Sequence, residues 1–139
     1  MPLKTYTFDT CALIAVIFKT KGHEKLRKIL DEVENNEAQI IMHKTNLVEA
    51  FKVIARNRDI ADAKMAYEHA IESPIIFHDT NDLPFCTEFA KVTNQFDTYF
   101  ADTFVITTNI LLTSNKGTIV TSDKGFDKVS KHAKVEYFK

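Results

Sequence analysis

The feature that most constrains this chain is a nearly continuous apolar stretch at residues 101–112, ADTFVITTNILL. A helix with almost no polar face has to be buried in the protein interior. The chain has 139 residues, which is enough to build a core around such a helix. Asp102 stands at the start of the stretch, and Asp123 follows the next apolar run, TIVT at 118–121. An acid at either place is a helix cap, a turn residue or part of a functional site.

Short apolar runs alternate with helical patterns along the rest of the chain. Runs without polar alternation are typical of parallel strands that helices cover on both faces. We therefore expect an α/β fold, a single three-layer α/β/α domain over residues 1–139 with a central parallel sheet. The predicted strands are 5–8, 39–42, 75–77, 118–121 and 135–138, and the predicted helices are 11–18, 23–35, 46–56, 59–71, 82–96 and 101–112, with a helical turn at 125–129.

Four acidic residues fall at strand ends or helix starts, where α/β folds of this kind usually place their functional residues. Asp9 and Asp123 end predicted strands, whereas Glu49 and Asp102 lie in the first turns of predicted helices that follow strands. Strand ends and the starts of the following helices share one edge of a parallel sheet, where ligands bind in such folds. The four side chains are therefore expected to converge on one pocket.

Each acid also has a purely structural explanation. Asp9 and Asp102 are cap candidates for the helices that follow them. Asn46 and Glu49 have the spacing of a capping box, and Asp123-Lys124-Gly125 has the composition of a turn. Taken together, four clustered carboxylates repel one another and destabilise a fold unless a cation is present. Sites made only of carboxylates suit hard divalent cations such as magnesium or manganese.

Charge and composition narrow the remaining possibilities. The net charge of −1 gives no general attraction to nucleic acid or membrane, so phosphate binding has to be local. Lys52 and Arg56 follow Glu49 at helical spacing, and we interpret them either as contacts to RNA phosphates or as a solvated helix face. The five histidines show no zinc-ligand spacing, and no glycine-rich phosphate loop is present. Two distant cysteines and the lack of a membrane-spanning apolar run favour a cytoplasmic protein with reduced thiols.

Several short motifs, in order and at matching spacing, resemble those of PIN-domain ribonucleases, and in particular the small VapC-type toxins. The motifs are TFDT at 7–10, TNLVE at 45–49, ADTFVI at 101–106 and VTSD at 120–123 followed by Gly125-Phe126. The resemblance covers essentially the whole chain. It implies the PIN fold and hydrolysis of RNA phosphodiester bonds that depends on Mg²⁺ or Mn²⁺. One departure is Cys11, where a serine is common in the family.

The resemblance also implies roles for individual residues and partners. Asp9, Glu49, Asp102 and Asp123 match the acidic quartet that binds metal and carries catalysis. The supporting residues are the hydroxyls of Thr10 and Thr121, which stand beside the acids, and Asp127 as an additional outer acid. The implied partners are an RNA substrate, a small antitoxin and a second copy in a homodimer. The alternative is a PIN-like module that binds RNA or protein without cutting, its acids serving as caps.

Overall fold

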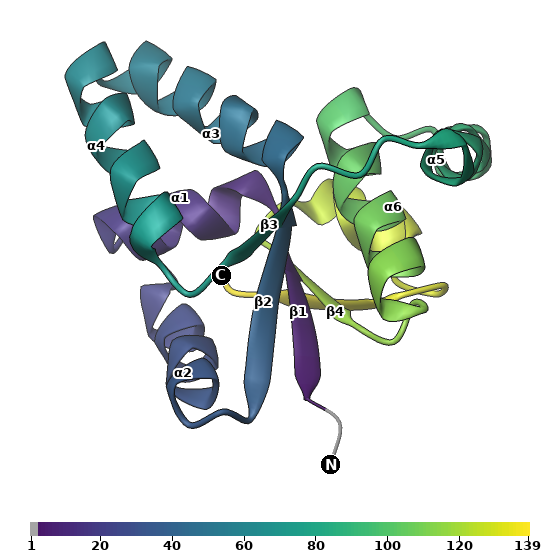
Figure 1. The fold of residues 1–139 in the computed structure, drawn as a ribbon, viewed down its shortest axis with the longest axis horizontal. Helices are drawn as coiled ribbons and strands as arrows, with labels where there is room; N and C mark the ends of the chain where they lie inside the picture. Colours follow the sequence, from purple (N-terminus) through teal and green to yellow (C-terminus); the bar gives the residue numbers. More distant parts are fainter. Residues whose placement is uncertain (1–2) are drawn as a thin grey trace.

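Five parallel strands form one sheet in the order β3-β2-β1-β4-β5 in the computed structural model, which describes residues 3–139 (Figure 1). The predicted domain of residues 1–139 includes residues 1 and 2, which lie outside the described part. All strand pairs are parallel, as the continuous apolar runs predicted. The strands are β1 (Lys4–Phe8), β2 (Ala38–His43), β3 (Ile76–His78), β4 (Thr118–Thr121) and β5 (Lys134–Tyr137).

Helices cover both faces of the sheet and complete the predicted three-layer α/β/α architecture. One core joins the inner sides of the first two helices to Phe8, Ile40 and Met42 of the sheet. A second core on the opposite face joins the last two α-helices to Ile119. The helices are α1 (Thr10–Phe18), α2 (His23–Glu34), α3 (Lys44–Asn57), α4 (Ile60–Glu72), α5 (Leu83–Phe96) and α6 (Phe100–Thr113), with the 3₁₀ turn η1 (Lys124–Lys128).

The strand order reverses between β1 and β4, because the chain leaves β1 toward β2 and leaves β4 toward β5. Phe8 pairs with Val120 at this point, and the Asp9 amide donates to the Val120 carbonyl at 3.1 Å. The first turns of α3 and α6 stand beside each other above these strand ends (Figure 1). In parallel α/β sheets the reversal point is the usual ligand-binding crevice.

The apolar stretch at 101–112 is the buried helix that the sequence predicted. Residues 105–109 of α6 are at most 1 % exposed. Asn109 is the polar anchor within it, since its Oδ1 accepts from the Thr7 hydroxyl at 2.8 Å and its Nδ2 donates to the Gly117 carbonyl at 3.1 Å. The helix is thereby tied to the central strand β1 and to the turn before β4.

The predicted elements all occur, with ends displaced by at most two residues. The third strand runs from Ile76 to His78 rather than from 75 to 77, and the last begins at Lys134. The capping box predicted at Asn46 is wrong, because α3 begins earlier and His43 Nδ1 accepts from the Thr45 amide at 3.1 Å. The prediction that Asp102 caps its helix is also wrong, because Tyr99 is the N-cap residue of α6.

No helix within residues 3–139 combines the length and the apolar character needed to cross a bilayer.

Candidate active site

Asp9 is the most buried of the four predicted acids. It follows β1, caps α1 through a 2.7 Å bond from the Thr10 amide to its Oδ1, and is 4 % exposed. Its other oxygen, Oδ2, accepts from the Thr121 hydroxyl at 2.8 Å and from the Cys11 thiol at 3.3 Å. Burial raises the pKa of Asp9, and these hydrogen bonds oppose the rise. The neighbouring strand β4 thus fixes the orientation of this carboxylate.

Glu49 is brought to the same edge by α3. Its Oε1 accepts a short hydrogen bond from the hydroxyl of Thr10, and the same hydroxyl lies 3.3 Å from the Asn46 carbonyl. Asn46 lies one turn before Glu49 and is fully buried, and its Nδ2 donates to the Ala101 carbonyl at 3.0 Å. Asn46 therefore joins the starts of α1, α3 and α6, which carry three of the four acids.

Asp102 lies in the first turn of α6, and its pKa is strongly raised. Burial is the largest cause of a rise in its pKa from 3.8 to about 7. The negative charges of Asp9, Asp123 and Glu49 raise it further, in that order. Across residues 3–139 no hydrogen-bond donor reaches the Asp102 carboxylate. All four predicted acids therefore share one electrostatic environment.

Asp123 completes this group from the end of β4. Its backbone amide donates to the Thr121 hydroxyl at 3.0 Å, and its Oδ1 accepts from the Gly125 amide at 2.8 Å. The side chain is exposed and caps η1, so the turn interpretation and the site interpretation hold together. Thr121 thus contacts both Asp9 and Asp123 across the reversal point.

Three of the predicted residues take no part in the hydrogen bonds that join this group within residues 3–139. Asp127 accepts a short hydrogen bond from the Tyr137 hydroxyl and is not among the charges that shift the pKa of Asp102. Lys52 and Arg56 are exposed on α3, one and two turns after Glu49, and neither forms an ion pair with any described residue.

The sequence analysis did not assign two residues to the candidate site, and it gave a third residue the wrong role. Lys128, on η1, is the cation that lowers the pKa of Asp102, and its Nζ donates to the Asp97 carbonyl at 2.8 Å. Cys11 contacts Asp9 and accepts from the Ser122 amide at 3.3 Å, so the residue that departs from the family pattern takes part in the network. Asn46, taken as a helix cap, is buried, and its Oδ1 has no hydrogen-bond partner among residues 3–139. Its only sequence signal was its place three residues before Glu49.

The donor set fits a hard divalent cation, although it does not form a closed cage. Within the described chain, no three histidine, cysteine or acidic side chains converge tightly enough to surround an ion as they stand. Magnesium keeps several waters and is commonly anchored by only one or two carboxylates, so it does not require such convergence. Burial and the negative charges of Asp9, Asp123 and Glu49 together raise the pKa of Asp102, and a bound divalent cation would offset the repulsion between these carboxylates.

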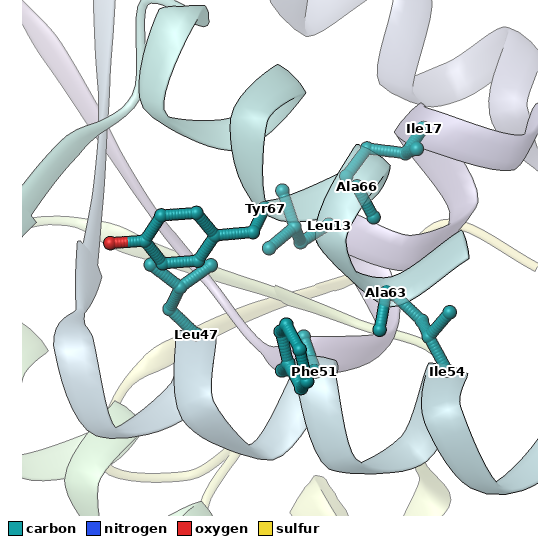
Figure 2. Close-up of a pocket in the computed structure, with 9 residues that line it drawn as sticks. Leu13, Ile17, Leu47, Phe51, Ile54, Ala63, Ala66 and Tyr67 are labelled. Atoms are coloured by element: carbon teal, nitrogen blue, oxygen red, sulfur yellow. The ribbon is translucent and has the colours of Figure 1, made fainter. Parts of the chain in front are cut away.

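The hollows elsewhere on the surface have a different chemistry. A narrow crevice among α1, α3 and α4 is lined by apolar side chains, and the hydroxyl of Tyr67 points out of it (Figure 2). It opens toward a hollow of about 280 Å³ lined by Leu47, Val48, Phe51 and Tyr67. No acid, histidine or cysteine lines either space, so neither is a candidate for the reaction centre.

Comparison with protein families identifies the family of this chain. The family model of the PIN domain matches residues 6–132. The chain belongs to the PIN domain family. The match spans all four acids, from Asp9 to Asp123, and members of the family are generally nucleases. A search of curated proteins found no match to this sequence.

Solved structures share this PIN fold over nearly their whole length. VapBC2 from Rickettsia felis, bound to a DNA fragment from its promoter, is 11% identical with a TM-score of 0.71, covering 96% of this chain and 98% of that one. VapBC-1 from nontypeable Haemophilus influenzae is 15% identical with a TM-score of 0.67 and the same coverage. DNA-bound VapBC from Salmonella typhimurium is 12% identical with a TM-score of 0.68, covering 99% and 100%. The chain is therefore a VapC-like PIN domain in its fold.

The electrostatics of Asp102 predict how stability depends on pH when no metal is bound. Below an ordinary pKa of 3.8 the carboxyl is protonated in both folded and unfolded protein, and stability is unaffected. Between 3.8 and about 7 the unfolded chain releases the proton that the folded protein retains, so the free energy of unfolding falls as pH rises. Allowing for solvent screening, we expect a loss of about 1–2 kcal/mol between pH 5 and pH 8. Urea denaturation in EDTA at the two pH values measures it.

Magnesium should restore stability at pH 8 much more than at pH 5, because the cation binds ionised carboxylates in the folded state only. The control is Asp102→Asn, which should reduce both the pH dependence and the response to magnesium. Equal responses of parent and variant would contradict the assignment of this pH dependence to Asp102.

Proposed function

We propose that this PIN domain is a ribonuclease that hydrolyses RNA phosphodiester bonds and depends on Mg²⁺ or Mn²⁺. The proposed catalytic and metal-binding residues are Asp9, Glu49, Asp102 and Asp123. The observation that carries the proposal is the grouping of these four acids at the reversal point of the sheet, where burial and the charges of Asp9, Asp123 and Glu49 raise the pKa of Asp102 to about 7. A fold gains nothing from such repulsion unless a cation offsets it.

The chemistry needs a cation because a phosphodiester is anionic and repels hydroxide. A bound divalent metal would lower the pKa of an attacking water and neutralise charge that develops on the phosphate. The protein's own part is to hold the ligands. Thr121 and Cys11 orient Asp9, and Thr10 orients Glu49, whereas Asp102 keeps its carboxylate free of hydrogen-bond donors from residues 3–139. Preorganised ligands reduce the reorganisation that the reaction requires.

The proposed biological setting is that of a toxin inhibited by a small antitoxin. The fold is shared with proteins described as VapBC complexes. The hollow lined by Leu47, Val48, Phe51 and Tyr67 has almost no polar surface, and Val48 is exposed beside it. An amphipathic partner helix gains stability by burying its apolar face in such a groove. A homodimer and a cytoplasmic location belong to the same proposal.

Lys52 and Arg56 are proposed to contact RNA phosphates next to the acids. The double variant Lys52→Ala/Arg56→Ala should weaken RNA binding several-fold and lower the slope of log affinity against log salt by about 0.7 per cation for single-stranded RNA. Fluorescence anisotropy with labelled RNA in EDTA, which prevents cleavage, measures both quantities. Lys28→Ala, on α2, is the matched control and should leave the slope unchanged. An unchanged slope in the double variant would remove both residues from the interface.

A non-catalytic binding module is the second candidate, because two of the acids do act as caps. Asp9 accepts from the Thr10 amide and Asp123 from the Gly125 amide. The deciding experiment is incubation of RNA with the purified protein in Mg²⁺ or Mn²⁺ and, separately, in EDTA. Cleavage that requires the metal and is lost in Asp9→Asn and Asp102→Asn supports the nuclease. RNA binding with no metal-dependent cleavage supports the binding module.

A further inference from the structure

We propose that Tyr99 and Phe100, which we call the aromatic corner, form a stacking site for an unpaired RNA base beside the acids. This inference rests on the proposed function and names how that site would hold its substrate. Tyr99 is 83 % exposed and Phe100 is 68 % exposed, at the first residues of α6. Neighbouring aromatic rings that are mostly exposed are candidates for binding.

The backbone of the aromatic corner is held without any contribution from the Tyr99 ring. The Tyr99 carbonyl accepts from the Thr103 amide at 2.9 Å and from the Thr103 hydroxyl at 2.8 Å. The Thr98 hydroxyl lies 2.6 Å from the same Thr103 hydroxyl, and Lys128 holds the Asp97 carbonyl. The Tyr99 ring itself takes part in no hydrogen bond or ring contact with residues 3–139. It is presented to solvent from a fixed support.

Phe100 is the outer member of an aromatic cluster. Its ring meets Phe89 edge-on at 5.4 Å and Phe104 at 5.1 Å between centroids. Phe104 in turn lies 5.8 Å from the buried Phe85 and 4.6 Å from His43. The inner rings fix the orientation of Phe100, so little conformational entropy remains to be lost when a flat ligand binds.

The aromatic corner lies at the proposed reaction centre. Tyr99 is the N-cap residue of α6 and Asp102 lies in the first turn of the same helix, three residues later. The start of α6 also faces the start of α3, to which Asn46 ties it (Figure 1). A base stacked on Tyr99 would therefore place its attached phosphate near the acids.

The charge of the molecule favours this kind of contact. The acids repel RNA phosphates, and a net charge of −1 supplies no general attraction. Among residues 3–139, Lys128 is the positive charge that lowers the pKa of Asp102. Stacking of bases on aromatic side chains contributes about 1–3 kcal/mol per base without relying on charge. It also selects single-stranded RNA, whose bases are free to leave the helical stack.

A second copy of the chain is a poorer occupant for this surface. Two aromatic side chains bury at most about 300–500 Å², whereas a stable interface needs about 800 Å² on each partner. Leu83, the other strongly exposed apolar residue of this helix pair at 78 %, begins α5. Phe89, which contacts Phe100, lies six residues after Leu83, about 9 Å along the axis of α5, so more than one helical turn separates Leu83 from the aromatic corner.

The test uses the fact that the chain contains no tryptophan. Tyr99→Trp introduces a single indole whose fluorescence is quenched when a base stacks on it. Titration with a single-stranded RNA of mixed sequence, in EDTA, should quench this signal to saturation, whereas duplex RNA should not. Leu83→Trp is the matched control, with similar exposure and no proposed contact, and should show no saturable quenching.

Affinity provides a second readout. Tyr99→Ala should weaken binding of single-stranded RNA about tenfold, the loss expected from removing one stacked base. Tyr99→Phe should keep near-parental affinity because it keeps the ring. The slope of affinity against salt should be the same in all three proteins, unlike that of the Lys52→Ala/Arg56→Ala variant, because no charge is removed.

Two results would overturn the inference: equal quenching in Leu83→Trp, or parental RNA affinity in Tyr99→Ala. Parental affinity together with a change of oligomeric state would identify a second copy as the occupant. Metal-dependent cleavage by the parent, with parental affinity in Tyr99→Ala, removes the stacking site and leaves the nuclease proposal standing. Saturable quenching without cleavage supports the stacking site and removes the nuclease.

Discussion

Asp102→Asn is expected to reduce RNA cleavage by about 10²–10⁴-fold in Mg²⁺ or Mn²⁺. Removing a ligand charge forfeits several kcal/mol of transition-state stabilisation, and each 1.36 kcal/mol is a factor of ten in rate. Asp9→Asn is expected to have a comparable effect, because its carboxylate is held by Thr121 and Cys11 at the centre of the group. Initial rates of cleavage of labelled RNA at saturating metal measure both.

Asp102→Asn should lower the cleavage rate without lowering the stability of the protein. An amide at position 102 removes the repulsion from Asp9, Asp123 and Glu49, so metal-free Asp102→Asn should be at least as stable as the parent at pH 8. Loss of cleavage in a protein that is equally or more stable is not explained by unfolding. Asp31→Asn is the control, since Asp31 lies on α2 in an exposed ion pair with Arg27 and should retain parental cleavage. Parental rates in both Asp9→Asn and Asp102→Asn would show that the catalytic assignment is wrong.

Asn109→Ala is expected to lower the free energy of unfolding by about 2–4 kcal/mol. Asn109 is fully buried and bonds both Thr7 on β1 and the Gly117 carbonyl before β4. Truncation leaves both of these groups buried without a partner and adds a small cavity. The better helix propensity of alanine offsets only about 0.7 kcal/mol of this loss. Urea denaturation followed by far-UV circular dichroism gives the value.

Leu111→Ala provides the comparison within the same helix. Leu111 is a partly exposed residue of α6, so its truncation should cost about 1 kcal/mol or less. If the two variants unfold at the same urea concentration, the Asn109 network does not stabilise the helix, and apolar burial alone holds α6 in place.

The fold was largely predictable because each strand and helix carries its own local signal. Runs such as QIIM at 39–42 and TIVT at 118–121 are apolar without alternation, which required a sheet covered on both faces. Asp59 and Asp82 were recognisable helix starts, and both accept capping bonds at 2.7 and 3.1 Å. The starts of α3 and α6 were misplaced, because His43 and Tyr99 are not common cap residues and their extended backbone is fixed by tertiary packing.

The candidate site was predictable to a different degree for each residue. The four acids were predicted to converge because strand ends and helix starts share one edge of a parallel sheet, which is a topological argument. Asp127 was predicted to support them; it accepts a hydrogen bond from the Tyr137 hydroxyl, and its supporting role stays a prediction. Lys128 was missed because nothing in the local sequence distinguishes it from other surface lysines.

The sequence by itself determined the alternation of elements, the burial of α6 and the edge of the sheet at which the acids gather. Those properties follow from side-chain hydropathy and chain direction, which act over a few residues. Only the tertiary structure decided the electrostatic partners of Asp102, the clamp that Asn46 makes between α1, α3 and α6, and the exposure of Tyr99 beside them. Charge repulsion, buried hydrogen bonds and solvent exposure depend on distances between segments far apart in the chain, and those distances exist only once the sheet has formed.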